Sequence, residues 1–512
     1  MAVLVLNFGS QYAHLIARRV RELGVYSEII SPETSVSEIM EKKPEGIILS
    51  GGPSSVYEQD ATRCDTKIFS LGVPVLGICY GHQLMASELG GRVEGGHKKE
   101  FGRVELEITG AKNSLFKQIQ PSQQVWFSHG DEVKQLPGGF EKTVSTGTCE
   151  NAGMADEKRN LFGIQFHPEV AHTPCGRQVL SNFLFQICAI TPTWRVDKNI
   201  ESNIAELKKQ VGEEKVVIGV SGGIDSMVAA TLLNKAIGTQ LHCVFIDTGL
   251  LRKNEAVEVR VTLERQGFRH VHFVDASQEF LQALAGVTDP EEKRKIIGHK
   301  FIEVFEKTAR EIGQSESIRF FAQGTIYPDR IESAQPAKQA AKIKSHHNLT
   351  LPEKMNFQII EPLREYYKDE VRALGRALGV PEELVGRHPF PGPGLAIRIL
   401  GEITEERLRI LREADAIFIE ELKSSGWYDR VGQAFAALLP VKSVGVMGDA
   451  RTYDYVIALR SVDTTDFMTA DWSKLPNELL EKVSNRIVNE VRGVNRVLYD
   501  ITQKPPGTIE YE

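Results

Sequence analysis

Short apolar runs alternate with helical stretches along the first part of the chain. VLVLN, GIILSGG and PVLGIC are β-rich runs of strand length, and YAHLIARRVRELG has the apolar spacing of an amphipathic helix. Strands and helices that alternate in this way predict a parallel sheet with helices on its faces. The pattern continues to about Ile190, and we therefore expect a first α/β domain over residues 1–190.

The same alternation begins again after a break. The segment ITPTWRV interrupts the rhythm with a proline between two threonines, and we expect a linker there. The strand KVVIGV follows, and strands and helices then repeat as far as RFFAQG. This repetition predicts a second parallel α/β domain over residues 191–390.

The pattern changes from about Pro391 onwards. VGVMGD, YDYVIALR and RVLYDIT are more amphipathic than the earlier runs and predict short strands, and ITEERLRILREADAIFIEEL has helical spacing. We expect a smaller α+β domain over residues 391–512. The fold class is then α/β, with two successive parallel-sheet domains followed by a smaller α+β C-terminal domain.

Composition narrows the class of protein. A chain of 512 residues exceeds one ordinary domain, and contents of 41% hydrophobic and 25% charged residues are typical of soluble globular proteins. No apolar run is long enough to span a bilayer, and MAVLVLNFGSQY lacks the basic start of a secretory leader. The net charge of −7, without a long basic run, excludes a general nucleic-acid binder. We expect no membrane and no nucleic-acid partner.

The cysteines indicate a reducing compartment. Six are scattered along the chain without any C-x-x-C pair, which argues against disulfides and against a structural zinc site. We therefore expect a cytoplasmic protein.

One cysteine lies at a joint between predicted elements. Cys79 follows the strand PVLGI and precedes a helical run, with Gly77 and Gly81 two residues away on either side. A sharp strand-to-helix turn of this kind strains the backbone and brings chains close together, which glycines permit. The helix N-terminus favours thiolate at this position. The alternative is a buried cysteine that acts only as a small hydrophobe.

A partner base follows in LFGIQFHPEV. His167 and Glu169 are two residues apart in what reads as an extended segment, so their side chains project to one side. An imidazole with a carboxylate beside it is the oriented base that a thiolate nucleophile needs. His129 precedes Asp131 and reads as a turn or substrate-pocket element. Together with the turn at Cys79, His-Pro-Glu predicts a Cys79–His167–Glu169 triad.

Residues 1–190 carry a family resemblance. G-x-C-x-G around Cys79, the later H-P-E, and the early turn Ser50-Gly51-Gly52-Pro53 resemble the class I glutamine amidotransferases. This resemblance implies hydrolysis of the glutamine side-chain amide through a thioester, with release of ammonia. It also implies that the backbone N–H groups of Gly52 and Tyr80 stabilise the oxyanion.

A phosphate-binding loop is predicted in the second domain. After the strand KVVIGV, the run Ser221-Gly222-Gly223-Ile224-Asp225-Ser226-Met227 turns into a helix. Backbone N–H groups at a glycine-rich helix N-terminus bind phosphate, and the serine hydroxyls add donors. No Lys-Ser/Thr pair closes the loop, so it is not a Walker A sequence. The S-G-G-x-D-S run resembles the pyrophosphate loop of the N-type ATP pyrophosphatases, which split ATP to AMP and pyrophosphate.

The order of the two halves resembles the glutamine-hydrolysing GMP synthase family over essentially the whole chain. Further segments carry the likeness: FIDTGLLRKNE, EEKRKIIGHKF, AQGTIYPDRIES, SHHN, HPFPGPGLAIR and DITQKPPGTIEYE. The resemblance implies a carbon–nitrogen ligase of purine biosynthesis. ATP adenylates the oxygen on carbon 2 of xanthosine monophosphate, and ammonia from the first domain displaces AMP to give GMP. It also implies a homodimer formed through the C-terminal domain.

Residue roles in the second half follow in part from this resemblance. Ser221 to Met227 bind ATP and pyrophosphate, and Asp225 is a ligand for Mg²⁺, which prefers oxygen donors. The candidate contacts to the nucleotide substrate are Arg294, Lys504, Thr508, Ile509 and Glu510. For Arg294 a merely solvated position on a basic helix is the alternative.

Three further positions stay open at this level. Asp247, at the end of a predicted strand, is either a ligand contact or a helix-capping residue. Gln323, Gly324 and Asp329 occupy a similar strand end. The proline-rich loop from His388 to Gly394 is either an interdomain strap or part of the nucleotide pocket.

Rival functions make different sequence predictions. A tRNA-thiolating enzyme would share the pyrophosphatase loop but show a basic surface and paired catalytic cysteines. A non-catalytic sensor would have lost Cys79, His167 or Glu169. An amidotransferase that makes asparagine or NAD would differ in the C-terminal domain.

Overall fold

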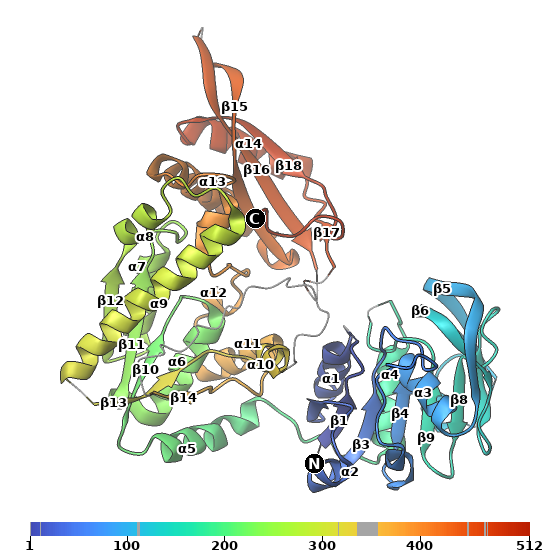
Figure 1. The fold of residues 1–512 in the computed structure, drawn as a ribbon. Helices are drawn as coiled ribbons and strands as arrows, with labels where there is room; N and C mark the ends of the chain where they lie inside the picture. The colour runs from blue at the N-terminus through green and yellow to red at the C-terminus, as the bar shows by residue number, and fades with distance from the viewer. Residues whose placement is uncertain are drawn as a thin grey trace. The chain divides into compact units, whose positions relative to one another are not determined.

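The computed structural model describes residues 2–10, 12–109, 113–170, 172–315, 317–334, 357–447, 450–464, 467 and 469–512. The chain forms two compact units, Met1–Arg195 and Val196–Glu512. Figure 1 colours the first unit blue to green and the second green to red.

The first unit is built on a nine-stranded sheet with the order β2-β1-β3-β4-β9-β8-β7-β5-β6. Five neighbouring strands are parallel: β1 (Ala2–Leu6), β2 (Ser27–Ile30), β3 (Pro44–Leu49), β4 (Val75–Ile78) and β9 (Leu161–Ile164). The other four are antiparallel: β5 (Arg92–Ile108), β6 (Ser122–Gln135), β7 (Glu141–Ser145) and β8 (Gly153–Asp156). The sheet is therefore mixed, where the sequence predicted parallel strands.

Helices cover the parallel part of this sheet. They are α1 (Ala13–Glu22), α2 (Val36–Glu41), α3 (Tyr80–Glu88) and α4 (Gly176–Ser181), with the short helical turns η1 (Thr66–Ser70), η2 (Ser114–Phe116) and η3 (Asn182–Ile187). Helix α1 buries Ile16 and Val20 and leaves Arg18 and Arg19 partly exposed, as its amphipathic pattern requires, whereas Arg21 is buried and donates to the Ser27 carbonyl oxygen. Helix α2 begins with a capping box between Ser35 and Glu38.

The second unit contains a five-stranded sheet in which every strand pair is parallel. Its order is β12-β11-β10-β13-β14, with β10 (Lys215–Gly219), β11 (Leu241–Asp247), β12 (His270–Asp275), β13 (Ile318–Ala322) and β14 (Gln358–Ile360). The chain leaves β10 towards β11 on one side and returns to β13 on the other. The carboxyl ends of β10 and β13 therefore form a topological switch point, where ligands bind in open α/β sheets.

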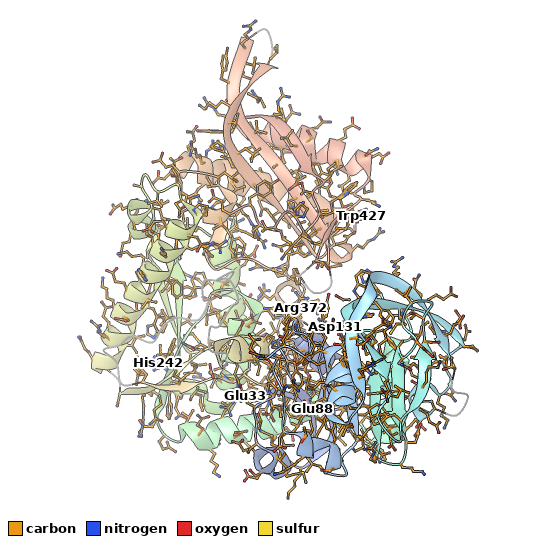
Figure 2. The ribbon with its side chains drawn as sticks, turned by 45° about the vertical axis from the view of Figure 1, so that its right-hand side comes forward. Glu33, Glu88, Asp131, His242, Arg372 and Trp427 are labelled. Atoms are coloured by element: carbon orange, nitrogen blue, oxygen red, sulfur yellow. The ribbon has the colours of Figure 1, made fainter. Side chains whose placement is uncertain are left out.

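Helices connect these strands. They are α5 (Ile200–Val211), α6 (Ile224–Ile237), α7 (Glu255–Arg265), α8 (Ser277–Ala283), α9 (Pro290–Ser315), α10 (Tyr327–Ala334), α11 (Lys368–Leu378) and α12 (Glu382–Val385), with the turns η4 (Asp197–Asn199), η5 (Gly238–Gln240) and η6 (Gly394–Arg398). His242, labelled in Figure 2, lies at the amino end of β11. Its ring stacks at 4.8 Å on the ring of His270, at the amino end of β12. This histidine pair thus lies at the end of the sheet opposite to the switch point.

The last part of the second unit is a smaller sheet packed against helices. Its strands are β15 (Gln433–Met447), β16 (Ala450–Asp463), β17 (Asp471–Trp472) and β18 (Val494–Asp500), and its helical elements are α13 (Glu405–Ser424), η7 (Tyr428–Arg430) and α14 (Asn477–Glu490). The expectation of short strands was wrong for β15 and β16, because the two pair as one long antiparallel hairpin. Pro440 and a register shift between Leu439 and Lys442 break the sequence pattern without ending the strand.

The second unit has a shared core. One hydrophobic cluster includes Val217 and Val244 from the parallel sheet, and Leu411 and Ile457 from the last part of the chain. The predicted boundary near residue 390 therefore lies inside one compact unit, and the three-domain division stays a prediction. Among the described residues, no helix is long and apolar enough to cross a bilayer.

Candidate active sites

Cys79 lies at the joint between β4 and α3. Its backbone has φ 54° and ψ −106°, a strained conformation for a residue with a side chain. A Cβ added at Gly77 would lie 2.5 Å from the Gly81 carbonyl oxygen, and one added at Gly81 would lie 2.5 Å from that of Leu49. Close backbone approach therefore requires both flanking glycines. The Cys79 sulfur lies 3.7 Å from Nε2 of Gln165.

His167 and Glu169 are in direct contact. Nδ1 of His167 lies 2.7 Å from Oε1 of Glu169, and the two residues are 3% and 1% exposed. They belong to a turn after β9, so the expectation of an extended segment was wrong. The chain turns because the Thr173 hydroxyl donates to the His167 carbonyl oxygen (2.7 Å) and holds the following loop against it. The predicted contact is made within this turn.

Charge decides the protonation of His167. Burial alone would lower the pKa of His167, but the carboxylate of Glu169 and the neighbouring Cys79, which hydrogen-bonds to the imidazole, outweigh it. The pKa of His167 is therefore raised well above 6.5. A charged imidazole next to a cysteine sulfur is the arrangement that activates a thiol nucleophile.

His82 and His129, two further histidines of this unit, have different surroundings. Burial lowers the pKa of His82 to about 4, and its Nε2 lies 3.1 Å from the Asn151 carbonyl oxygen, so this residue is a neutral part of the core. His129 lies in β6 rather than in a turn, with Nδ1 2.7 Å from the Asp131 carbonyl oxygen. Its neighbour Ser128 presents its carbonyl oxygen 3.8 Å from the Cys79 sulfur, which keeps this strand beside the nucleophile.

The two predicted oxyanion donors are close to Cys79. Tyr80 is the first residue of α3, and its ring would be 3.3 Å from a Cβ added at Gly52. A Cβ added at the neighbouring Gly51 would lie 3.3 Å from the His167 ring and 3.6 Å from the Cys79 Cβ. The glycine turn after β3 therefore borders both the nucleophile and the base. A side chain at Gly51 would crowd both of them.

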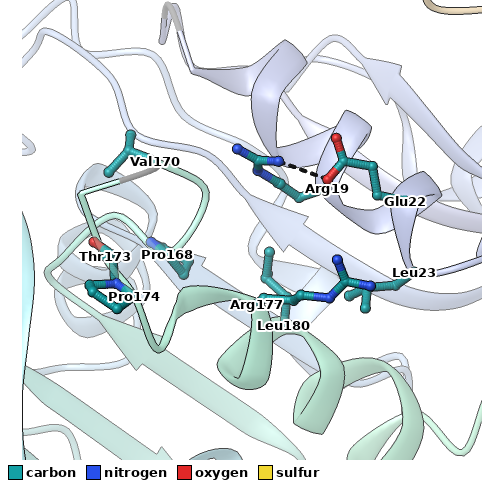
Figure 3. A pocket seen from close by; sticks show the side chains of 9 residues that line it. All are labelled: Arg19, Glu22, Leu23, Pro168, Val170, Thr173, Pro174, Arg177 and Leu180. Carbon is teal, nitrogen blue, oxygen red and sulfur yellow. Dashed lines mark hydrogen bonds and ion pairs between the residues drawn. The ribbon is translucent and has the colours of Figure 1, made fainter. Parts of the chain in front are cut away.

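A pocket borders the turn that carries the base (Figure 3). Its volume is about 170 Å³, and it is lined by residues of α1, the turn and α4: Arg19, Glu22, Leu23, Pro168, Val170, Thr173, Pro174, Arg177 and Leu180. Nε of Arg19 donates to the Glu169 carbonyl oxygen (3.0 Å), and its Nη1 pairs with Glu22. Arg19 thus ties α1 to the backbone of the triad from the side of this pocket.

The loop after β10 has the layout of a phosphate site. It ends at Gly223, which is the N-cap of the 14-residue helix α6. The Ser226 hydroxyl accepts from the Ser221 N–H (3.2 Å) and donates to the Gly223 carbonyl oxygen (3.0 Å). Gly222 has a φ of 79°, a conformation that glycine adopts without strain. The N–H groups of the first turn and both hydroxyls therefore gather at the positive end of α6.

Asp225 pairs with a lysine that sequence reasoning missed. Its Oδ2 contacts Nζ of Lys368 at the start of α11, and its Oδ1 is buried without a partner among the described residues. An orphan carboxylate oxygen beside phosphate donors fits Mg²⁺, which takes one or two protein carboxylates and completes its shell with phosphate and water. Among the described residues, no cluster of three or more His, Cys, Asp or Glu side chains could hold a metal. The substrate would have to supply most of the ligands.

The end of the neighbouring strand β13 lies beside this loop. A Cβ added at Gly324, after β13, would lie 3.1 Å from the Ser226 backbone nitrogen, so this strand end borders the loop. Asp247 accepts from the Gly249 N–H (2.9 Å) in a local turn, and Asp329 from the Ile326 N–H (3.3 Å). Asp329 therefore accepts from the residue before α10, as a helix cap does, whereas Asp247 closes a local turn at which no helix begins.

The proline-rich loop joins two parts of the second unit. His388 accepts a hydrogen bond from the Ala434 N–H at Nδ1 (3.2 Å), and its ring stacks on Tyr428 at 3.9 Å. Leu395 donates its N–H to the Leu250 carbonyl oxygen (2.8 Å), after β11. The loop therefore links the parallel sheet to the last sheet, as the strap interpretation required.

Most of the predicted nucleotide contacts lie in one region of the second unit. Nη2 of Arg294, on α9, donates to the Glu512 backbone oxygen (2.6 Å). Glu510 forms a two-pronged ion pair with Arg398 (2.9 and 3.0 Å) and accepts from Gln433 (2.7 Å).

The rest of the segment 504–512 contacts the last sheet and its loops. Nζ of Lys504 donates to the Phe467 carbonyl oxygen (2.7 Å), Thr508 donates its hydroxyl to the Glu510 carbonyl oxygen, and Ile509 is buried. The segment SHHN, residues 345–348, lies outside the described residues.

Family comparisons agree with this division of sites. Residues 4–187 match the class-I glutamine amidotransferase family, residues 196–272 the NAD synthase family, and residues 420–511 the GMP synthase C terminal domain. The fold and the two sites therefore define a glutamine amidotransferase joined to an ATP-using synthetase.

Full-length relatives narrow this class. The chain is 56% identical to the glutamine-hydrolyzing GMP synthase of Carboxydothermus hydrogenoformans and 55% identical to that of Aquifex aeolicus, covering 100% of this chain and 99% of each relative. The enzyme of the same name from Thiobacillus denitrificans is 54% identical at the same coverage. The chain belongs to the family of glutamine-hydrolysing GMP synthases, which are ligases.

Proposed function

We propose that the first unit hydrolyses the side-chain amide of glutamine. The Cys79 sulfur attacks the amide carbon, and His167 gives a proton to the departing ammonia. Water then attacks the thioester with His167 as base, which releases glutamate. Glu169 holds the imidazole in position, and the N–H groups of Gly52 and Tyr80 bind the oxyanion. The contact of His167 with Glu169, next to a strained cysteine turn, is the observation that carries this proposal.

The second unit uses ATP to activate a purine carbonyl. In our proposal the oxygen on carbon 2 of xanthosine monophosphate attacks the α-phosphorus of ATP, and pyrophosphate leaves into the loop from Ser221 to Met227. Ammonia then attacks carbon 2, AMP leaves with that oxygen, and GMP remains. Adenylation is needed because a free carbonyl oxygen is a poor leaving group.

Mg²⁺ would be held at Asp225. When bound, the ion would neutralise charge on the phosphates of ATP. The residues of the chain have separate tasks: Ser221 and Ser226 donate to pyrophosphate oxygens, and Lys368 is placed to take a phosphate contact once Asp225 turns to the metal. The ion pair of Lys368 with Asp225 supports this proposal, because it shows a positive charge beside this carboxylate.

The nucleotide substrate is proposed to bind near α9. Arg294 and Lys504 offer charges for its phosphate, while Thr508, Ile509 and Glu510 contact the ribose and the base. Support comes from the Arg294–Glu512 contact, which places an arginine of α9 against the segment 504–512.

The direct test of this function is a product analysis. The purified chain, incubated with ATP, Mg²⁺, glutamine and xanthosine monophosphate, should give GMP, AMP, pyrophosphate and glutamate in equal amounts. The related asparagine- and NAD-forming reactions are checked with their own acceptors. Turnover of ATP to ADP, or no GMP from xanthosine monophosphate, would overturn the assignment.

We also propose a homodimer through the last sheet. Apolar side chains are exposed on β15 and β16, with Val441, Val446 and Tyr453 at 61%, 75% and 58%. Exposed apolar clusters of this kind mark interaction sites. In light scattering, V446D should shift the protein from dimer to monomer, while V261D on α7 should leave it a dimer. A monomeric parent protein would refute this proposal.

A cytoplasmic location completes the proposal. None of the six cysteines forms a disulfide in the described part of the chain, as expected for a reducing compartment. Cell fractionation tests this directly, and recovery of the protein in an oxidising compartment would contradict it.

A further inference from the structure

A lysine of α9 is buried in full and holds a single carboxylate. Lys293 is 0% exposed, and its ammonium group contacts the Glu512 carboxylate and donates to the carbonyl oxygens of Ile399 (2.8 Å) and Ala396 (3.3 Å). A lysine ammonium carries three donors, so all three are used here. Burial lowers the pKa of Lys293, while the Glu512 carboxylate acts in the opposite direction.

Glu512 is held from two further directions. Its Oε1 accepts from the Gly401 N–H (3.0 Å), and its backbone oxygen accepts from Nη2 of Arg294 (2.6 Å). The side chain of Glu512 is 8% exposed. A buried ion pair stabilises little by itself, but removing one partner leaves the other charge buried and costly. The ion pair of Lys293 with Glu512 therefore contributes more to the position of the chain end at Glu512 than to the free energy of unfolding.

A second buried cation holds the same segment two residues earlier. Arg398 is 0% exposed and binds both carboxylate oxygens of Glu510. Arg398 ends η6, and the carbonyl oxygens that surround Lys293 come from residues on either side of Arg398. Two buried cations, Lys293 on α9 and Arg398 in η6, thus bind the carboxylates at the end of the segment 504–512 and fix the position of that end.

We propose that Lys293 is a positioning residue for the nucleotide substrate, and that it acts through Glu512. It does not touch the substrate. By holding Glu512, it fixes the segment 504–512 against α9, where the next residue, Arg294, is itself a proposed phosphate contact. This inference rests on the proposed function. It explains why a fully buried lysine lies beside the proposed site for the nucleotide substrate.

The consequence is a selective defect in nucleotide affinity. In K293M, Glu512 loses its cation, and in E512Q the lysine loses its anion, so the segment 504–512 samples other positions and fewer enzyme molecules are ready to bind. We expect the KM for xanthosine monophosphate to rise about tenfold in each variant, with kcat at saturating nucleotide changed less than about twofold.

The experiment uses the full chain with ammonium salt as nitrogen source, so that the first unit does not limit the rate. E512D should recover part of the affinity. The matched control is K295M, because Lys295 lies on the same helix with an exposed, loose ion pair to Glu292 (3.9 Å) and should keep the parent KM. The double variant K293M/E512Q should be no weaker than the worse single variant, since both changes break one contact.

Several outcomes would overturn the proposal. They are an unchanged KM in K293M, a fall in kcat without a change in KM, or fully additive losses in the double variant. Thermal unfolding of every variant separates loss of folding from loss of positioning, and E512Q retains a folded chain as the milder change. If the parent protein makes no GMP, the proposed function fails; if it does and K293M equals K295M, only the role of Lys293 fails.

Discussion

The two candidate sites differ in how complete they are before any ligand binds. Cys79, His167 and Glu169 are 6%, 3% and 1% exposed, and the triad base already contacts its carboxylate. In the phosphate loop, Ser221 and Ser226 lie at the surface and bind one another. Covalent chemistry needs its nucleophile and base aligned in advance, whereas a phosphate supplies the acceptors that organise a loop of donors.

Backbone strain follows the same division. Cys79 is held at φ 54°, and the strain is maintained because Gly77 and Gly81 let neighbouring backbones pack against the turn. The phosphate loop places its one positive φ before α6 at a glycine, Gly222, where it costs little. In the proposed roles, the first unit thus holds its reacting groups in place before glutamine binds. The second unit completes its site only when the phosphates of ATP bind.

The largest effect is expected for C79A. Without the thiol no thioester forms, so glutamine-dependent GMP formation should fall by about 10⁴-fold or more. Synthesis with ammonium salt should stay near the parent rate because the second unit is unchanged. Rates with each nitrogen source are measured side by side. Loss of both activities in a folded variant would show that the two sites are not separable.

The second-largest effect is expected when the carboxylate of the triad is replaced by an amide. E169Q removes the charge that raises the pKa of His167, so that pKa falls and the imidazole loses its proton at a lower pH. Glutaminase activity should drop by roughly 10²- to 10³-fold, and the alkaline limb of its pH profile should move to lower pH. An alkaline limb at the parent position would contradict the role given to Glu169.

Substitutions in the loop before α6 should lower the rate of GMP synthesis by less, and to the same extent with glutamine and with ammonium salt. S226A and D225N remove single ligand contacts, and adenylation should slow about tenfold to a hundredfold. D275N at the end of β12, two strands away from the loop in the sheet, is the control, since Asp275 accepts from the Ser277 N–H in a local turn (3.0 Å). Pyrophosphate release at the parent rate in S226A and D225N would make the loop a structural turn.

The last prediction concerns the loss of stability in acid, which should be of similar size in the two units. Burial lowers the pKa of His82 in the first unit and of His388 in the second to about 4 each. The unfolded chain binds protons near pH 6.5, so this stability is present above pH 6.5 and is lost as the pH falls towards 4. The loss is at most about 3 kcal/mol for each histidine. Calorimetry from pH 7 to 4.5 that showed rising stability would contradict this sign.

The sequence predicted those parts of each site that are local in the chain. The turn at Cys79, the His167–Glu169 pair and the loop before α6 depend on neighbouring residues, whereas the closeness of Gly324 to this loop depends on a strand order that the sequence did not predict. The Lys368–Asp225 and Lys293–Glu512 contacts join residues far apart in the chain, and no periodicity indicates such a partner.

Errors in the fold prediction have a similar origin. The expected parallel sheet of the first unit continues as the antiparallel strands β5 to β8. Strands β5 and β6 are rich in charged and polar residues and lack the apolar runs from which the parallel strands were predicted. The hairpin of β15 and β16 is longer than predicted because Pro440 interrupts the pattern but not the pairing. His167 lies in a turn that depends on the Thr173 hydroxyl, a contact outside the motif itself.

Transfer of nitrogen from the first site to the second is the central claim, and isotope labelling tests it most directly. The parent protein receives glutamine labelled with ¹⁵N in its amide, with xanthosine monophosphate, ATP and Mg²⁺, and C79A receives the same mixture plus unlabelled ammonium salt. We predict ¹⁵N in the amino group of GMP from the parent protein and unlabelled GMP from C79A. Labelled GMP from C79A, or unlabelled GMP from the parent protein, would contradict the account.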